Sequence, residues 1–455
     1  MSFPANIFAG QSFAVVGLGR NGLPAARRLL AMGAAVTVWD DQPQARAAAV
    51  GLDVRMPDFA GLTALVLSPG IPHRLPQPHP IAAAALAAGV PILSDVELLF
   101  RAVRAAGSGA RFVGVTGTNG KSTTTALLAH MLEQAGRPVA AGGNLGTAAL
   151  ALPLLGDDGV YVIEMSSYML ERITSLRFTE AVMLNLSPDH LDRHGDMDGY
   201  ARAKRAIFDR QQAGDLAVLG VEDEFSRAMA AGLRRGLAQV LTVSGSSPAD
   251  IWAEGSQLRD GAGVIADLAA ARALPGAHNA QNAAAAVAIA DHLGLGRAAI
   301  VAGLMTYPGL PHRQETVASI AGVRFVNDSK ATNADSTARA LECYERMILI
   351  AGGMAKEGGI EPLAQYFPRL ALVLLIGRDA PIFAATLAEH GVPHRIVGTL
   401  AAATEAAWQE ASSGRAPVVL LSPACASWDQ FTGFDQRGDQ FRDQVRAIAE
   451  RERVA

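Results

Sequence analysis

Apolar and polar positions along the chain follow a repeated β/α pattern. Short runs rich in β-branched residues end in loops that carry Gly, Ser or Asn, and stretches rich in Ala and Leu follow them. In the first part of the chain, three such runs predict strands: "FAVVGLG", "AAVTVWD" and "ALVLSPG". Because buried parallel strands are continuous apolar runs of this kind, the pattern favours a parallel sheet.

The same pattern returns in two further sets. The second contains "RFVGVTG", "GVYVIEM", "EAVMLNLS" and "DLAVLG" and closes with the helix "NAQNAAAAVAIADHLG", and the third contains "VRFVNDS", "RMILIAGG", "ALVLLIG" and "PVVLLSP". A small-residue linker near 105–110 and the Pro- and Gly-rich "MTYPGLPHRQE" separate the sets. We therefore predict an α/β protein with three domains, formed by residues 1–105, 106–308 and 309–455.

Composition narrows the class of protein. The net charge is −4, so no basic excess is available to attract nucleic acid or an anionic membrane. Two cysteines, Cys343 and Cys425, cannot build a disulfide framework and favour a reducing compartment. The opening "MSFPANIFAG" lacks the pattern of an export signal, and "IAAAALAAGVPIL" is too short to span a bilayer. We expect a cytoplasmic enzyme that binds neither nucleic acid nor membrane.

The loop "GVTGTNGKSTTT" (114–125) lies between a predicted strand and a predicted helix. It departs from the common Gly-x4-Gly-Lys-Ser/Thr spacing, because Val115 stands where the first glycine belongs. It still offers successive backbone N–H groups, a helix N-terminus, a lysine for terminal phosphates and hydroxyls for Mg²⁺. We favour a nucleotide site over a plain glycine-rich turn, with these members: Gly117, Thr118, Asn119, Gly120, Lys121, Ser122 and Thr123.

A second glycine-rich turn, "GLGRNG" (17–22), follows the first predicted strand, and Asp40 ends the next strand 18 residues beyond Gly22. Alone, this arrangement is typical of a dinucleotide site, but the same turn holds any diphosphate or simply packs a helix on a strand. "SPGIP" (68–72) adds a loop at another strand end of the same domain.

Further polar residues follow strands of the second and third sets. Glu164 and His190 are a carboxylate and an imidazole near a triphosphate and suit a metal site, and Lys204 lies on the helix that follows. Lys330, Thr332, Lys356 and Ser427 lie in three loops of the third set and suit a small dicarboxylate. Ordinary loop polarity is the alternative for each single residue.

Together these segments resemble the Mur ligase family. The motifs "TGTNGKST", "EMSSYML", "NLSPDHLDRH", "AKRAIF", "PGAHNAQNAAAA", "GLPHRQE" and "NDSKATN" occur in the family's order over nearly the whole chain. The first-domain "GLGRNG…SPGIP" and the terminal "SPACASWDQF" are similar to the branch that adds D-glutamate.

The resemblance implies a Rossmann-like N-terminal domain, a P-loop-type central ATPase domain and a Rossmann-like C-terminal domain. It implies an ATP-dependent ligase of peptidoglycan synthesis, working as a monomer, that joins D-glutamate to UDP-N-acetylmuramoyl-L-alanine through an acyl phosphate. It also implies two Mg²⁺ ions, one on Ser122 or Thr123 with Glu164 and one on His190 with a carbamylated Lys204. Lys121, Glu164, His190 and Lys204 would be the catalytic residues.

The remaining site residues are also carried by the resemblance. Beyond the loop itself, ATP would meet Asn279, Arg313 and Asp328, with Asn282 near Asn279. The UDP substrate would meet Gly19, Arg20, Asn21, Gly22, Asp40, Asp41, Ser68, Pro69, Gly70, Asn144, Ser166 and His190. D-glutamate would meet Thr332, Lys356, Ser427 and Phe434, the last through its backbone.

Met169 and Met354 depart from residues that the family often carries there, which leaves amino-acid specificity open, including D- against L-glutamate. Three alternatives stay open: another Mur-type or folylpolyglutamate-type ligase, a nicotinamide-dependent oxidoreductase suggested by "GLGRNG" and Asp40, and a nucleotide-binding regulator without turnover.

Overall fold

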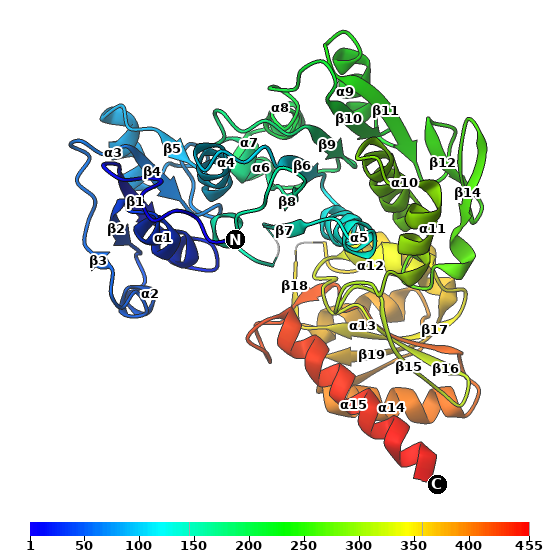
Figure 1. The fold of residues 1–455 in the computed structure, drawn as a ribbon. Coiled ribbons are helices and arrows are strands. Elements are labelled where there is room, and N and C mark those ends of the chain that lie inside the picture. Colours follow the sequence, from blue (N-terminus) through cyan, green and yellow to red (C-terminus); the bar gives the residue numbers. More distant parts are fainter. Residues whose placement is uncertain (145, 357, 455) are drawn as a thin grey trace. The chain divides into compact units, whose positions relative to one another are not determined.

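The computed structural model describes residues 1–144, 146–356 and 358–454 (Figure 1). Residues 145 and 357, which follow the predicted site residues Asn144 and Lys356, lie outside the described residues. The chain forms two compact units, one from Met1–Ala271 with Asn279–Tyr307 and the other from Arg272–His278 with the residues from Pro308 onward. No helix of the described residues is both long enough and apolar enough to cross a membrane.

The first unit contains two sheets. The smaller sheet is parallel, in the order β3 (Asp53–Val54), β2 (Ala35–Trp39), β1 (Ser12–Val16), β4 (Ala64–Leu67) and β5 (Ile92–Leu93). Four helices accompany it: α1 (Gly22–Ala31), α2 (Pro43–Ala47), α3 (Pro80–Ala87) and α4 (Asp95–Ala105). The three strands predicted from apolar runs are β1, β2 and β4, whose buried residues form the centre of this sheet.

The larger sheet of the first unit has nine strands. In order they are β14 (Gly263–Asp267), β13 (Gln257–Asp260), β12 (Ile251–Glu254), β11 (Gln239–Ser244), β10 (Leu216–Gly220), β9 (Glu180–Met183), β6 (Arg111–Thr116), β8 (Val160–Glu164) and β7 (Val139–Gly143). The strands from β7 to β12 are parallel, and β12, β13 and β14 pair antiparallel. The four predicted strands are β6, β8, β9 and β10.

Seven helices belong to this nine-stranded sheet and its loops. They are α5 (Lys121–Gln134), α6 (Ser167–Leu170), α7 (Leu191–His194), α8 (Met197–Arg205), α9 (Glu224–Leu233), α10 (Ala277–His292) and α11 (Arg297–Thr306). The predicted closing helix is α10, whose alanines are almost all buried.

The second unit is built on a six-stranded sheet. Its order is β15 (Glu315–Ile320), β16 (Val323–Asn327), β21 (Val418–Leu421), β17 (Met347–Gly352), β19 (Leu370–Ile376) and β20 (His394–Gly398), and β18 (Met354–Ala355) pairs separately with β22 (Cys425–Ala426). Alternate residues of β19 face opposite ways. Val373 and Leu375 pack towards α12 (Ala334–Glu342) and α13 (Ala380–Glu389), while Leu372 and Leu374 pack towards α14 (Leu400–Ser412) and α15 (Phe434–Val454). Helices therefore cover both faces, and the mixed α/β architecture with several sheets confirms the predicted fold class.

The carboxylate of Glu97 holds α4 to the loop after α6. It is fully buried and accepts hydrogen bonds from the backbone N–H groups of Thr174, Ser175 and Leu176 and from two side-chain hydroxyls. Burial alone would raise the pKa of Glu97, but the hydrogen bonds from Ser175, Thr174 and Leu176 outweigh it and lower this pKa to about 2.

We predict that Glu97→Gln lowers the free energy of unfolding at neutral pH by about 3 kcal/mol, because the amide replaces an acceptor surrounded by donors. The carboxylate stabilises the fold fully above its unfolded-state pKa near 4.5, and that contribution is lost as pH falls through about 2. The difference between wild type and variant should therefore shrink as the pH falls below 4.5. Urea denaturation followed by circular dichroism measures it, with the exposed Glu389→Gln as the control. An equal loss in both variants would contradict this account.

Candidate functional site

The predicted nucleotide loop lies where several parallel strands of the large sheet end. Val115 of β6 pairs with Glu164, the last residue of β8, and Thr116 pairs with Met183, the last residue of β9. Because parallel strands end at the same edge, the loops after β6, β8 and β9 meet there. The register therefore brings the phosphate-loop residues and Glu164 to one edge, as expected from the sequence.

The loop between β6 and α5 needs glycine at two positions. Gly117 and Gly120 have φ of 147° and 86°, in the region that disfavours other residues. A Cβ on Gly120 would lie 2.2 Å from Oδ1 of Asn282 in α10. Asn282 Nδ2 in turn donates to Oδ1 of Asn279 at 3.2 Å. The two asparagines singled out in the sequence thus form a pair packed against the glycine-rich loop.

Two lysines share one backbone carbonyl of this loop. Lys121 Nζ donates to the Gly117 oxygen at 3.0 Å and to the Thr118 oxygen at 2.9 Å. Lys204, from α8, donates to the same Gly117 oxygen at 2.8 Å and to Thr116 Oγ1 at 3.3 Å. The two amine groups therefore lie at the glycine-rich turn, where a phosphate-binding loop binds the phosphate oxygens.

Lys204 is 1% exposed and has no ion-pair partner among the residues that the structure describes. Burial, followed by the charge of Lys121, lowers the pKa of Lys204 well below its ordinary value. The aromatic ring of Tyr200 lies 4.8 Å from Nζ. A buried lysine of this kind is readily found as the neutral amine, the form that acts as a nucleophile.

Glu164 is a candidate metal ligand on direct structural grounds. It is 2% exposed, and its Oε1 accepts a hydrogen bond from Asn144 Nδ2 at 2.8 Å. Its Oε2 is buried and has no hydrogen-bond partner in the described ranges of the chain. Such an oxygen suits a bound cation, since an unpaired buried carboxylate oxygen is costly. Ser122, also buried, opens α5 at the same edge.

Among the described residues, no group of three His, Cys, Asp or Glu side chains is arranged as a metal site. The candidates beside the loop are instead one carboxylate, one serine and one lysine, with His190 on the next loop. The carboxylate and the serine hydroxyl fit Mg²⁺, which binds through one or two protein oxygens, keeps several waters and takes substrate phosphates as ligands. The unmodified amine of Lys204 is not such a ligand.

His190 has a left-handed backbone, with φ of 53°, just before α7. Its imidazole lies 3.3 Å from Asp189 Oδ2, and its ring centre lies 5.0 Å from that of Tyr168. Ser166, predicted to approach the same substrate, caps α6 by accepting a hydrogen bond from Met169 N at 3.3 Å.

A cavity of 440 Å³ lies at the carboxyl ends of β1, β2 and β4. It brings together eight of the residues predicted to bind the UDP substrate: Gly19, Arg20, Asn21, Asp40, Asp41, Ser68, Pro69 and Asn144. The predicted Gly22, Gly70, Ser166 and His190 are not among its lining residues. A Cβ on Gly22 would lie 1.8 Å from the Gly17 oxygen, so Gly22 serves the close packing of the turn.

Asp40 has a local structural role in this pocket. Its carboxylate accepts hydrogen bonds from the N–H groups of Leu18, at 2.6 Å, and Gln42, at 2.8 Å. The side chain therefore fixes the glycine-rich turn to the end of β2. Asp41 instead pairs with His79 Nε2 at 2.9 Å, and hydrogen bonds from His79 and Trp39 lower the pKa of Asp41.

In the second unit, Arg313 precedes β15, and the other predicted residues follow β16, β17 and β21 in the chain. Asp328 is buried, and its two oxygens accept hydrogen bonds from Gln314 N at 3.2 Å and Ser422 Oγ at 2.8 Å. Burial raises the pKa of Asp328 to about 7. Ser427 is buried, Thr332, Arg313 and Phe434 are partly exposed, and Lys356 is exposed.

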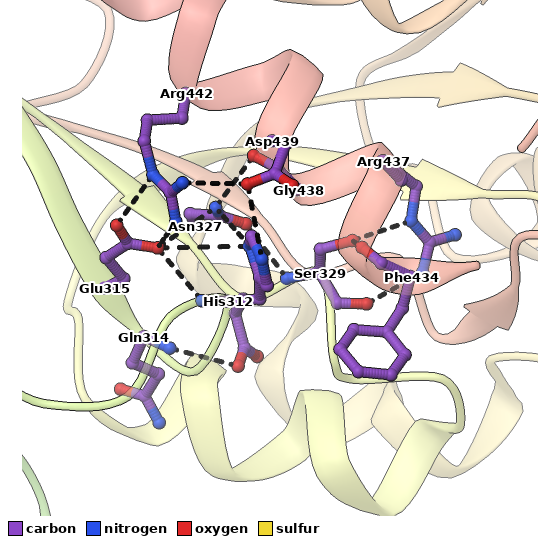
Figure 2. Close-up of polar contacts among 11 residues, drawn as sticks. His312, Gln314, Glu315, Asn327, Ser329, Phe434, Arg437, Gly438, Asp439 and Arg442 are labelled. Atoms are coloured by element: carbon purple, nitrogen blue, oxygen red, sulfur yellow. Dashed lines mark hydrogen bonds and ion pairs between the residues drawn. The ribbon is translucent and has the colours of Figure 1, made fainter. Parts of the chain in front are cut away.

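Sequence reasoning missed the buried arginine beside Phe434. Figure 2 shows Arg437 pointing at Ser329: its Nε donates to Ser329 Oγ at 2.9 Å and its Nη2 to the Ser329 carbonyl at 2.8 Å. Ser329 Oγ then donates to the Phe434 carbonyl at 2.7 Å. Arg437 is 0% exposed, and burial lowers its pKa to about 10. This chain of bonds fixes the first turn of α15 against the loop after β16.

A second network in Figure 2 fixes the segment before β15. Arg442 makes two hydrogen bonds to the Glu315 carboxylate, at 3.0 and 3.1 Å, and Glu315 accepts from His312 N at 2.9 Å. Asn327 Nδ2 lies 3.0 Å from both His312 Nδ1 and the Gly438 carbonyl. The network holds the "PHRQE" segment, which carries Arg313.

One signal in the sequence could have strengthened the site prediction. The chain contains 4 lysines, Lys121, Lys204, Lys330 and Lys356, and each lies in a segment proposed for ligand binding. The other cations are arginines, which the structure uses mainly for pairing and for carbonyl contacts. A lysine amine can lose its proton or be modified, whereas a guanidinium stays charged.

Two parts of the chain match models of one protein family. Residues 115–290 match the Mur ligase middle domain, and residues 312–425 match the Mur ligase glutamate ligase domain. UDP-N-acetylmuramoylalanine–D-glutamate ligase of Paramagnetospirillum magneticum is 50% identical over 97% of this chain and 98% of its own. The protein of the same name from Caulobacter sp. is 46% identical over 98% of each chain.

Among solved structures, UDP-N-acetylmuramate–alanine ligase of Thermotoga maritima has the same fold. Its TM-score is 0.60 at 17% sequence identity, over 96% of this chain and 99% of its own. Sequence identity at the level of the relatives above, over nearly the full length of both chains, establishes descent as well as fold. The chain therefore belongs to the Mur ligase family, the family of these D-glutamate-adding relatives.

Proposed function

We propose that this protein uses ATP to join D-glutamate to the L-alanine carboxylate of UDP-N-acetylmuramoyl-L-alanine, a step of peptidoglycan synthesis. One observation carries the proposal: Lys121 and Lys204 converge on the Gly117 carbonyl, beside the buried Oε2 of Glu164, for which the described part of the chain offers no hydrogen-bond partner. The lysines would bind a polyanion and the carboxylate would bind a cation, side by side at the end of a glycine-rich loop.

The chemistry explains why such a site is needed. A carboxylate resists attack by an amine because its own charge repels the nucleophile and its oxide is a poor leaving group. Transfer of the γ-phosphoryl group to the carboxylate gives an acyl phosphate, which the D-glutamate amine then attacks with loss of phosphate. The first step brings two anions together, so positive charge must be in place beforehand. In our proposal, Lys121 provides it at the terminal phosphates of ATP.

Mg²⁺, when bound, would neutralise the phosphate oxygens during transfer. Ser122, or Thr123, and Glu164 would hold one ion, and His190 with a modified Lys204 would hold the second. Gly117, Thr118, Asn119 and Gly120 would orient the phosphates through backbone N–H groups.

The environment of Lys204 supports its proposed carbamylation. The ammonium group first loses a proton. The neutral amine then adds to carbon dioxide: the N–C bond forms, one C=O π bond becomes a carboxylate oxygen, and a second proton leaves the nitrogen, so the cation becomes an anion. Burial and the adjacent Lys121 both favour the neutral amine of Lys204. The resulting carbamate would turn a residue that repels a metal into one that binds it.

We further propose the division of labour among the domains. The 1–105 domain would hold the UDP moiety in the 440 Å³ cavity, and the acyl end would extend towards Asn144, Ser166 and His190. The 106–308 domain would bind ATP, with Asn279 at adenine. The 309–455 domain would contribute Arg313 and Asp328 to the nucleotide. In that domain D-glutamate would meet Thr332, Lys356, Ser427 and the backbone of Phe434. The enzyme would act as a monomer in the cytoplasm, where ATP is made and free thiols persist.

A substrate panel tests the proposed function. Phosphate release is measured with UDP-N-acetylmuramoyl-L-alanine, ATP, Mg²⁺ and a series of amino acids. We expect turnover with D-glutamate and little with L-glutamate or a diamino acid. Turnover that requires a diamino acid, L-glutamate or a folate would assign the chain to another ligase, and nucleotide binding without turnover would make it a regulator. Tight NADH binding that no UDP-sugar competes with would support an oxidoreductase.

Lys121→Ala should reduce phosphate release by a factor of about 1,000 or more, since the loss of a charge at the transferred phosphate costs about 4 kcal/mol. Circular dichroism and the thermal midpoint should stay close to wild type, because the side chain lies in a loop-facing position at the start of α5. Arg446→Ala, on the outer surface of α15, is the matched control for removal of a cation. Near-normal turnover of Lys121→Ala would remove the phosphate-loop assignment.

Lys204→Ala should lose most activity and recover part of it in millimolar short-chain carboxylic acids, because a small acid can occupy the space of the carbamate. Lys204→Arg should not respond to the acids, since the guanidinium fills that space and keeps its charge. Rates with and without acetate, at fixed ionic strength, provide the measurement. Normal activity of Lys204→Ala would show that the second metal site lies elsewhere.

A further inference from the structure

Two arginines hold the turn that forms one wall of the substrate cavity. This turn, Leu67–Ile71, follows β4, and its Ser68, Pro69 and Ile71 line the cavity. Arg172, which follows α6, donates from Nη1 to the carbonyls of Leu67 at 2.8 Å and Ser68 at 3.1 Å, and from Nη2 to that of Ile71 at 2.5 Å. The guanidinium thus converges on three carbonyls of one turn.

The sequence of the turn explains why it needs an outside donor. Pro69 and Pro72 have no N–H group, so the segment "SPGIP" is short of internal donors for its carbonyl groups. Arg172 supplies several from a fixed planar fork. The side chain is 2% exposed, and its Nε donates to His73 Nδ1 at 3.3 Å. Burial lowers the pKa of Arg172 to about 10, so the group stays charged at neutral pH.

Arg193 binds the same turn from a second segment, and we call Arg172 and Arg193 together the clamp. Its Nη1 donates to the Gly70 carbonyl at 3.1 Å, and its guanidinium carbon lies 4.2 Å from the centre of the Tyr168 ring. Arg193 lies in α7, three residues after His190, and Arg172 lies eight residues after Glu164. The wall of the cavity is therefore attached to the two segments that carry the proposed catalytic residues.

The clamp also reaches the glycine-rich turn on the other side of the cavity. Ser68 Oγ donates to the Gly17 carbonyl at 2.7 Å, and a Cβ on Gly17 would lie 2.7 Å from both Ser68 Cβ and Ile71 Cδ1. A shift of Ser68 or Ile71 would consequently displace the Gly17–Gly22 turn. The position of both walls depends on the turn that Arg172 holds.

We propose that Arg172 is a positioning residue for the UDP-linked substrate. It fixes the 67–71 wall of the cavity through hydrogen bonds to backbone carbonyls, without contacting the ligand. The inference rests on the proposed function, which places the UDP moiety in this cavity. A purely structural alternative exists, in which Arg172 only fastens one sheet of the first unit to the other. The two differ in their effect on ligands, because a fastener affects stability without selecting between the UDP substrate and ATP.

Arg172→Lys tests the proposal, since lysine keeps a cation but cannot reach three carbonyls in one plane. We expect the KM for UDP-N-acetylmuramoyl-L-alanine and the Kd for UDP, measured by calorimetry, to rise at least tenfold. The Kd for ATP and kcat at saturating substrate should stay within about twofold of wild type. Unchanged UDP affinity, or an equal weakening of UDP and ATP, would overturn the proposal.

Arg101→Lys is the matched control. Arg101, in α4, binds the loop after α6 through Thr174 Oγ1 at 2.9 Å and binds Glu97 of its own helix at 2.8 Å, but it does not contact the 67–71 turn. Replacement of Arg101 should leave UDP affinity unchanged, and a tenfold loss of UDP affinity in this control would favour the structural alternative.

If Arg172→Lys fails to fold, Arg193→Lys should raise the Kd for UDP at least threefold, and an unchanged Kd would overturn the proposal. Failure of the proposed function is distinguishable, because wild type would then show no turnover with the UDP substrate.

Discussion

The shared carbonyl of Gly117 is the contact around which the proposed ATP site is organised. Two lysine side chains meet on one backbone oxygen, at 2.8 and 3.0 Å, and a single carbonyl dipole would offset little of their repulsion if both were protonated. The phosphates of ATP would relieve this repulsion at Lys121, and loss of a proton followed by carbamylation would relieve it at Lys204. The site therefore carries excess positive charge, which bound ATP would offset at Lys121 and the carbamate at Lys204. Because the carbamate would also hold the second metal ion, the binding of ATP and the binding of metal would be coupled.

The parallel sheets explain how distant segments reach this place. Thr116, Glu164 and Met183 end β6, β8 and β9 and lie at one edge of the large sheet. The loops that follow these strands carry, in turn, the proposed phosphate-binding residues, the α6 segment and His190. The first sheet does the same for the cavity, with turns after β1, β2 and β4. Arginines then fix these turns by binding carbonyls, as Arg172 and Arg437 do, because a guanidinium supplies several donors in one plane.

The sequence predicted the central strands and the loops that follow them, because buried parallel strands are uniform apolar runs with polar ends. It did not predict β12, β13 and β14, whose "IWAE", "QLRD" and "GVIAD" mix polar and apolar residues and pair antiparallel. Asp40 was expected at a ligand, which stays a prediction; the sequence did not show that both its oxygens also bind backbone N–H groups. Arg172, Glu97 and Arg437 were missed because a single buried charge leaves no periodic signal, and its partners are backbone groups far away in the chain.

In the proposed reaction, the outermost phosphate of ATP is passed to a carboxylate before the amide bond forms. Substrate labelled with ¹⁸O in the L-alanine carboxylate distinguishes this route from one without an acyl phosphate. If the acyl phosphate forms, one labelled oxygen leaves with the phosphoryl group, and mass spectrometry finds one ¹⁸O in each released phosphate. If the released phosphate carries no label while the amide product accumulates, the carboxylate was never phosphorylated and the account is wrong.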